Sequence, residues 1–361
     1  MASFILRRLG QAVIVLLVMS LLVFMGVYVI GNPVDVLISP DVTQEMRLQV
    51  IRQYGLDLPL WEQYWQFLQR LLTGDLGKSF VFNMPVMTLI GQRLPATLEL
   101  TLIAVFFASA VGIPLGIYAG YKPDSFIAKS IMAVTILGFS VPTFWIGLML
   151  IMVFAVQLGV LPAGGRGQTA ELFGIPFSFL TADGWSHLIL PAVNLSLFKL
   201  SMMCRLAASG TREVMLTDTI KFARAAGISE GTILRRHVLK LISIPLVTVF
   251  GLELGSTLAF ALVTETIFNW PGLGKLIVDS ITSLDRPVMV AYLMLVSALF
   301  GCHQSLRRSC LCSNRSAPAS GEELICRRPT SKPRRPFLRP LNSGAPSAAT
   351  RWRLLHSRWC C

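Results

Sequence analysis

The stretch that decides the fold runs from Asp218 to Pro245 and reads DTIKFARAAGISEGTILRRHVLKLISIP. It is basic and compatible with water, yet it lies between two long apolar runs. Asp218 is expected to cap a short helix that ends at Gly227, because glycine readily adopts the left-handed conformation of a helix terminus. Ser229 is expected to cap the next helix. We therefore predict a compact helical segment that faces the cytoplasm and receives a mechanical input there.

The composition is that of a membrane protein. Of the 361 residues, 53% are hydrophobic and only 14% are charged, and several apolar runs reach the length of about 20 residues that crosses a bilayer. The net charge of +13 arises mainly in residues 301–361, which hold 12 Lys/Arg and 2 acidic residues, against 20 and 17 in the first 300. Six of the seven cysteines also follow residue 300. The main body therefore has no disulfide framework, and the charge does not indicate nucleic-acid binding.

The apolar runs predict an all-α polytopic protein with six spans. The spans are expected at residues 9–30, 96–118, 131–156, 188–208 and 241–264, with a sixth that begins near 288 and stops being apolar at about residue 300. Residues 1–30 are interpreted as an uncleaved first span, because the run ends in Ile-Gly-Asn-Pro without a small-residue cleavage site. Pro142 is expected to kink the third span.

Basic residues set the expected orientation and domain limits. The positive-inside rule places the N-terminus, the turn at 122–129 and the loop at 209–240 in the cytoplasm. Residues 31–94 then form an outward segment, with short amphipathic helices expected at 43–54 and 60–72. Residues 95–300 form the membrane core.

Residues 301–361 break the pattern of the rest. They are rich in Arg, Ser, Pro and Cys, show no periodicity and lack a standard zinc-site spacing. We interpret them as a disordered tail that results from a frameshift, rather than as a metal site or a basic tail that binds lipid or nucleic acid.

No motif for catalysis, nucleotide or metal is found. Gly77-Lys78-Ser79 resembles the end of a phosphate-binding loop, but Leu72 stands where that loop needs glycine and no strand precedes it. The four histidines are scattered. The prediction is a non-enzymatic chain without catalytic residues, metal or cofactor.

Two further sets of residues are candidate sites. Lys199 and Glu253 lie about 12 residues into their spans, near mid-bilayer, where ionisable groups usually pair or line a pathway. They are expected to form a structural pair, to line a cavity, or to be accommodated separately facing lipid. Trp270 is expected to anchor at the membrane interface, before a turn.

Six motifs, in this order, carry a family resemblance. They are FILRRL (4–9), YGLDLPL (54–60), GDLGKS (74–79), LPATLEL (94–100), ARAAG (223–227) with His237 and Pro245 after it, and FNWPGLG (268–274). Together they resemble the B-type inner-membrane permease of the bacterial dipeptide/oligopeptide ABC importers, over roughly residues 1–300. The outward segment 31–94 favours the B-type over the C-type subunit.

The resemblance implies a permease subunit of the bacterial inner membrane that imports peptides. Its implied partners are a C-type permease, ATP-binding subunits that hydrolyse ATP, and a periplasmic peptide-binding protein. The residues implied to couple to the ATPase are Ala223, Arg224, Ala225, Ala226, Gly227, His237 and Pro245. The residues of the outward loop, a contact for the binding protein or an outer gate, are Trp270, Pro271, Gly272 and Gly274. The chain departs from the family at Ala226, where lysine is usual, and at Lys240-Leu241, where Arg-Asn is common.

Two alternatives remain open on the sequence. The load of the same kind of permease could be nickel, glutathione or another small solute. An ion-driven secondary carrier is a more distant alternative, which would typically contain a second copy of its own fold.

Overall fold

The structure is a computed structural model that describes residues 10, 14, 15, 17–26, 44–53 and 57–313. Residues 1–310 form one compact unit and residues 311–361 another. Helices dominate the described residues, as predicted. Most of the tail, and parts of the first predicted span and of the outward segment, lie outside the described residues.

The elements follow one another with short connections. After a helix at Leu17–Gly26, they are α3 (Gln44–Gln53), α4 (Leu60–Leu72), α5 (Val86–Tyr121), α6 (Phe126–Ser140), α7 (Thr143–Leu150), the π-helix η1 (Ile151–Gln157), β1 (Ala170–Leu172), β2 (Ile175–Phe177), α8 (Ala182–Met215), α9 (Asp218–Ala225), α10 (Glu230–Thr232), the π-helix η2 (Ile233–Val238), α11 (Leu239–Phe260), α12 (Leu262–Ile267), α13 (Leu273–Thr282) and α14 (Arg286–Ser313). The predicted helices at 43–54 and 60–72 are confirmed as α3 and α4.

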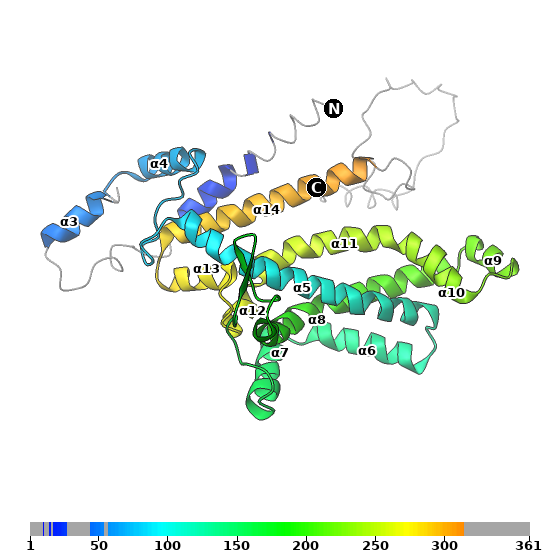
Figure 1. Cartoon of the computed structure of the whole chain (residues 1–361). Coiled ribbons are helices and arrows are strands. Elements are labelled where there is room, and N and C mark those ends of the chain that lie inside the picture. The colour runs from blue at the N-terminus through cyan, green and yellow to red at the C-terminus, as the bar shows by residue number, and fades with distance from the viewer. Residues whose placement is uncertain (1–9, 11–13, 16, 27–43, 54–56, 314–361) are drawn as a thin grey trace, which may run out of the picture. The chain divides into compact units, whose positions relative to one another are not determined.

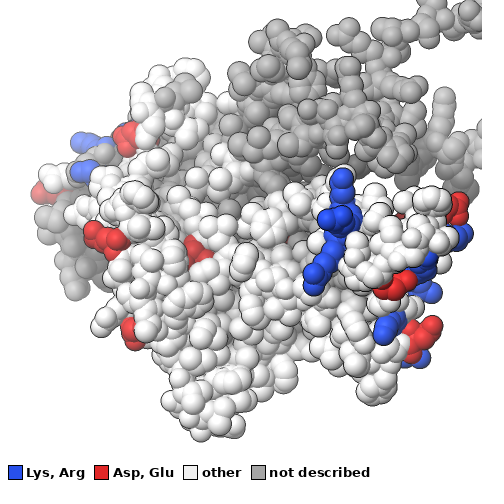
Figure 2. Space-filling view, turned by 45° about the vertical axis from the view of Figure 1, so that its right-hand side comes forward, with Lys and Arg blue, Asp and Glu red and all other residues white. Residues whose placement is uncertain are grey.

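Three of the described helices are long and apolar enough to cross a membrane: α5, α8 and the continuous helix Glu230–Thr257. A fourth span is present if α6 and α7–η1 count together, and the apolar helices Leu17–Gly26 and Arg286–Leu299 are shorter. The described residues therefore give up to four of the six predicted spans. Figure 2 shows a broad uncharged expanse on one face, with charged side chains gathered mainly toward its edges.

Pro142 lies at a break between two helices. The chain bends by 103° between α6 and the α7–η1 helix. Pro142 stands directly before α7, and its carbonyl accepts hydrogen bonds from the backbone N–H groups of Trp145 and Ile146 at 3.1 and 3.2 Å. Because proline lacks an N–H and restricts its predecessor, it begins a new helix here instead of continuing the old one. In place of the one kinked helix that was predicted, the structure has two helices that meet at Pro142.

Helices α5 and α8 lie side by side, with α6 and α11 packed along them (Figure 1). Three glycines at four-residue spacing, Gly112, Gly116 and Gly120, form one stripe of α5 against α8. A Cβ atom at Gly116 would overlap the carbonyl oxygen of Cys204 and come within 2.7 Å of Ala207 Cβ. The two backbones are therefore in direct contact, which small residues permit in membrane helices.

The Gly77-Lys78-Ser79 motif has a structural role. The Ser79 hydroxyl donates a hydrogen bond to Asp285, and the N–H of Phe80 donates to the same carboxylate at 3.1 Å. Asp285 is completely buried. The segment is thus fixed to the start of α14.

Replacing Gly116 by alanine is expected to destabilise the protein by about 1–3 kcal/mol, because the added methyl group has no room against α8. The measurement is the apparent melting temperature of the purified protein in detergent. Gly91→Ala is the matched control, since Gly91 lies on the same helix with nothing within 4 Å of an added Cβ. Equal melting temperatures for the two variants would contradict the packing described.

Candidate functional site

The basic hairpin, defined here as residues 217–238, comprises α9, α10 and η2 and lies at one end of α8 and α11 (Figure 1). Thr217, not Asp218, occupies the N-cap position of α9, and Asp218 instead accepts a hydrogen bond from Lys221 Nζ at 2.9 Å. Gly227 has φ +78°, as predicted. Ser229 occupies the N-cap position of α10, but its side chain makes no capping hydrogen bond and its hydroxyl lies 2.9 Å from Thr232 Oγ1. The predicted loop at 209–240 is therefore shorter, because α8 continues to Met215.

The predicted coupling residues of this segment do not all lie on one exposed surface. Ile220 and Ala223 are buried against Ile233 of η2 and the residues around it, and Ala223 is only 3% exposed. Its side chain is therefore not available to a partner's groove, whereas Ala225 and Ala226 are exposed.

The exposed face of α9 carries an apolar side chain that the sequence analysis missed. Phe222 is 76% exposed, between exposed Lys221 and Arg224. The spacing of Ile220 and Ala223, three residues apart, was the available signal, because it places Phe222 off the buried face. A helix that presents phenylalanine, arginine and small residues to solvent is suited to insert into a groove of another protein.

An ion pair closes the turn of the basic hairpin. Arg224 Nε donates to Glu230 Oε1 at 2.7 Å, across Gly227. The hairpin packs on α8 and α11, and Ile113 and Ile117 of α5 pack against the same apolar cluster.

The two other predicted coupling residues lie off the exposed face of α9. His237 is on η2, where its Nδ1 is buried without a partner among the described residues. Pro245 is exposed inside α11. The structure therefore brings together residues 223–227, but not these two with them.

Lys199 of α8 and Glu253 of α11 form an ion pair. Lys199 Nζ lies 2.5 Å from Glu253 Oε2, and their side chains are only 11% and 10% exposed. Ser256 Oγ accepts from Lys199 Nζ and donates to Glu253 Oε2, both at 3.2 Å. The structure thus places these two residues in contact, and their role as a structural pair or in lining a cavity stays a prediction.

The loop at 268–274 contains the predicted turn, but not an interfacial tryptophan. Trp270 is completely buried, and its Nε1 donates to the carbonyl of Ala96 at 2.9 Å. Pro271 follows it, and Gly272 precedes α13. A Cβ at Gly272 would overlap the buried carboxylate of Glu265, so this glycine gives that carboxylate room.

The buried side chain of Glu265 joins α12 to α5 and α13. Its carboxylate accepts from Thr97 Oγ1 at 2.7 Å and from the N–H of Lys275 at 3.0 Å. Gly274 packs between Leu262 and Glu265. The outward-loop residues thus hold α12 and α13 against the first half of α5, and their role toward a partner stays a prediction.

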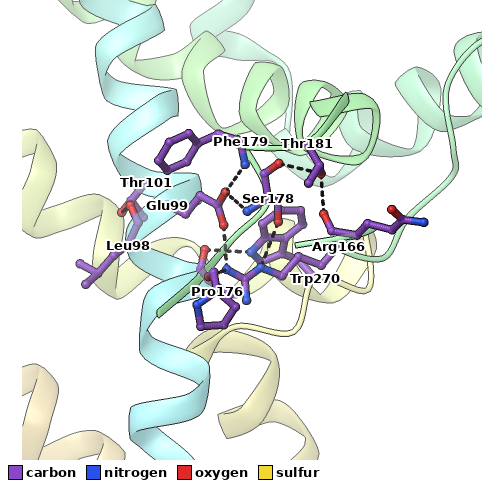
Figure 3. A network of polar contacts seen from close by, with 11 residues as sticks. Leu98, Glu99, Thr101, Arg166, Pro176, Ser178, Phe179, Thr181 and Trp270 are labelled. Atoms are coloured by element: carbon purple, nitrogen blue, oxygen red, sulfur yellow. Dashed lines mark hydrogen bonds and ion pairs between the residues drawn. The ribbon is translucent and has the colours of Figure 1, made fainter. Parts of the chain in front are cut away.

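A second buried carboxylate, Glu99 of α5, was not singled out from the sequence (Figure 3). Its Oε1 accepts from the N–H groups of Ser178 and Phe179 at 2.6 and 2.7 Å, and its Oε2 accepts from Arg166 Nη2 at 2.8 Å. Arg166 also donates to the carbonyl of Pro176 at 2.7 Å. The signal in the sequence was an acidic residue in an apolar helix and one arginine in a loop with few charges.

Comparison with known proteins gives consistent matches. The family model described as "Binding-protein-dependent transport system inner membrane component" matches residues 112–303. The corresponding N-terminal model matches residues 1–101. These matches cover the part of the chain where the six motifs lie and leave residues 304–361 unmatched.

Curated relatives cover most of the chain. The dipeptide transport system permease protein DppB of Escherichia coli (strain K12) is 35% identical over 318 residues, which is 83% of this chain and 93% of that protein. The glutathione transport system permease protein GsiC of Escherichia coli O6:H1 is 35% identical over 301 residues, with the same coverage. A solved structure, an inward-facing MetNI methionine ABC transporter, is similar at a TM-score of 0.47 and 18% identity, over 62% of this chain and 96% of that chain.

Reversing one charge of the Lys199–Glu253 pair is expected to destabilise the fold, by about 3–5 kcal/mol, because it leaves a buried charge without compensation. Lys199→Glu and Glu253→Lys should each lower the amount of folded protein in the membrane, and the double variant should restore it. Restored folding with transport still lost would show that the pair also lines the pathway.

The exposed pair Lys275–Asp279 provides the control for this experiment. Lys275→Glu should change the amount of folded protein little, since exposed pairs contribute about 0–1 kcal/mol. If Lys199→Glu is as mild as this control, the structural importance of the buried pair is refuted.

Proposed function

Because the chain belongs to the binding-protein-dependent transport system inner membrane component family, we propose that it is the B-type permease subunit of an ATP-driven importer of di- and oligopeptides in the bacterial inner membrane. The chain supplies half of the translocation pathway and a C-type permease the other half. In this proposal all six spans cross the bilayer, with the N-terminus in the cytoplasm. The partner ATP-binding subunits hydrolyse ATP, and this chain carries no cofactor of its own.

The observation that carries the coupling proposal is the exposed face of α9. Phe222, Arg224, Ala225 and Ala226 face solvent at the end of the helix bundle, while Ile220 and Ala223 anchor α9 to its own hairpin. A helix that is packed on one side and exposed on the other can bind a partner and can transmit the partner's displacement to the helices on which it packs. Because packed helices move as rigid bodies, closure of the ATPase would rock α8 and α11.

The peptide substrate is proposed from the relatives. Glutathione is itself a small peptide, so the two relatives transport chemically related molecules. The buried Lys199–Glu253 pair offers one charge of each sign. A peptide with a charged amino and carboxyl terminus would be attracted to such a pair if it lines the pathway.

Glutathione is the second candidate substrate, because a relative named for glutathione matches as much of the chain. Uptake into vesicles that hold the assembled transporter separates the possibilities. A labelled dipeptide should accumulate, vanadate should block the accumulation, and excess unlabelled tripeptide should compete. Stronger competition by glutathione or by nickel would reassign the substrate, and vanadate-insensitive uptake would favour an ion-driven carrier.

Phe222→Ala is expected to lower ATP-driven uptake by about 10-fold or more, because an exposed aromatic anchor at the centre of a contact is typically worth about 2 kcal/mol or more. The measurement is uptake together with co-purification of the ATPase subunits. Phe126→Ala is the matched control, since Phe126 is 84% exposed but lies on α6. Equal effects of the two substitutions would overturn the assignment of α9 as the ATPase contact.

A further inference from the structure

The β-hairpin, defined here as residues 166–179, is held at its base by one carboxylate. Glu99 binds Arg166 before β1 and the N–H groups of Ser178 and Phe179 after β2. Figure 3 shows the Glu99 side chain reaching from α5 into this base. Both ends of the hairpin are therefore attached to a single point on α5.

Arg166 completes the attachment from within the hairpin. Its guanidinium donates to Glu99, to the Pro176 carbonyl and to Ser178 Oγ, the last at 3.1 Å. It also lies over the Trp270 ring, 6.0 Å from the ring centroid. The Glu99 side chain is completely buried and that of Arg166 is 11% exposed, so water screens this pair little.

The tip of the hairpin, by contrast, is open. Phe173 is 95% exposed at φ +54°, and no part of the described chain covers it. The base is therefore rigid and the tip is accessible. This combination suits an element that another molecule contacts and whose displacement must reach the helix below.

Glu99 lies in the first half of α5, and the basic hairpin lies near the C-terminal end of this helix. The 22 residues from Glu99 to Tyr121 span about 33 Å of helix, which is close to the roughly 30 Å thickness of the bilayer core. Ile113 and Ile117, near the C-terminal end of α5, pack against the apolar cluster that contains Ile220 and Ile233 of the basic hairpin. Between the two ends, the glycine stripe fixes α5 to α8, from which the basic hairpin continues.

We propose that Glu99 and Arg166 are positioning residues that fix the β-hairpin to α5, so that the signal of the loaded binding protein reaches α5 and, through the α5–α8 pair, the basic hairpin. This inference rests on the proposed function, which supplies a binding protein on the side opposite the ATPase. Glu99 and Arg166 touch neither substrate nor ATPase. Their effect is on communication between the two sides of the membrane.

The test uses the complete transporter in lipid vesicles, with ATPase activity measured without and with peptide-loaded binding protein. In Glu99→Gln the carboxylate charge is removed, and the Arg166 charge is left uncompensated. Basal ATPase activity should stay near that of the unmodified transporter, while stimulation by the binding protein should fall at least about fivefold, the lower end of typical coupling between sites. Limited proteolysis should cut the β-hairpin faster.

Glu171→Gln is the matched control, because it removes a carboxylate from the exposed part of the same hairpin. In this variant the stimulation of ATPase activity by the loaded binding protein should equal that of the unmodified transporter. Arg166→Lys, which keeps the charge but loses the fork of donors, serves as a second variant if Glu99→Gln does not fold, and should show an intermediate loss.

The outcomes distinguish the inference from the function on which it rests. If the unmodified transporter is stimulated and Glu99→Gln is stimulated equally, the inference is overturned and the proposed function stands. A parallel fall of basal and stimulated activity would reduce Glu99 to a structural residue and also overturn it. Absence of stimulation in the unmodified transporter would overturn both.

Discussion

Direct backbone contact between α5 and α8 is the constraint on which the rest of the structure depends. Inside a bilayer the lipid tails are as apolar as leucine, so helices gain little from burying apolar side chains against each other. The stripe at Gly112, Gly116 and Gly120 allows the two helices to pack closely, and this packing supplies the stabilisation that apolar burial does not. Because the two backbones are already in contact, neither helix can move closer to the other, and the two form one rigid pair. The break at Pro142 and the junction between α11 and α12 lie outside the stripe.

Buried carboxylates hold the loops in place around the helices that the glycine stripe joins. Glu99, Glu265 and Asp285 each accept hydrogen bonds from segments distant in sequence, and each does so with backbone N–H groups or hydroxyls. A buried charge is costly unless several donors surround it. These three therefore select one arrangement of the loops that connect the helices. Glu99 also pairs with Arg166, as Glu253 does with Lys199.

Much of the fold could be predicted from the sequence, because bilayer-length apolar runs and amphipathic spacing are local signals. The bounds of α4 were predicted to the residue, and the left-handed Gly227 follows from residue chemistry alone. The family was recognised from the order of short motifs. The Lys199–Glu253 pair was among the alternatives, because ionisable residues at similar depth in neighbouring spans have few other partners.

What could not be predicted depends on contacts between distant segments. Trp270 has the local pattern of an interfacial anchor, and only the fold shows that α5 and α8 enclose it. Ala223 belongs to an alanine-rich run, yet its face is decided by Ile233 across the turn. The span at 131–156 is continuous in hydropathy, and hydropathy does not report the direction of the chain after Pro142.

The attachment of Ser79 to Asp285 also has a consequence for biosynthesis. The two residues are 206 positions apart. At a synthesis rate of about 5–20 residues per second, the donors at 79–81 wait roughly 10–40 s before their acceptor leaves the ribosome. A segment made early therefore obtains its acceptor only after 206 further positions have been made, and its polar groups need water or another partner until then.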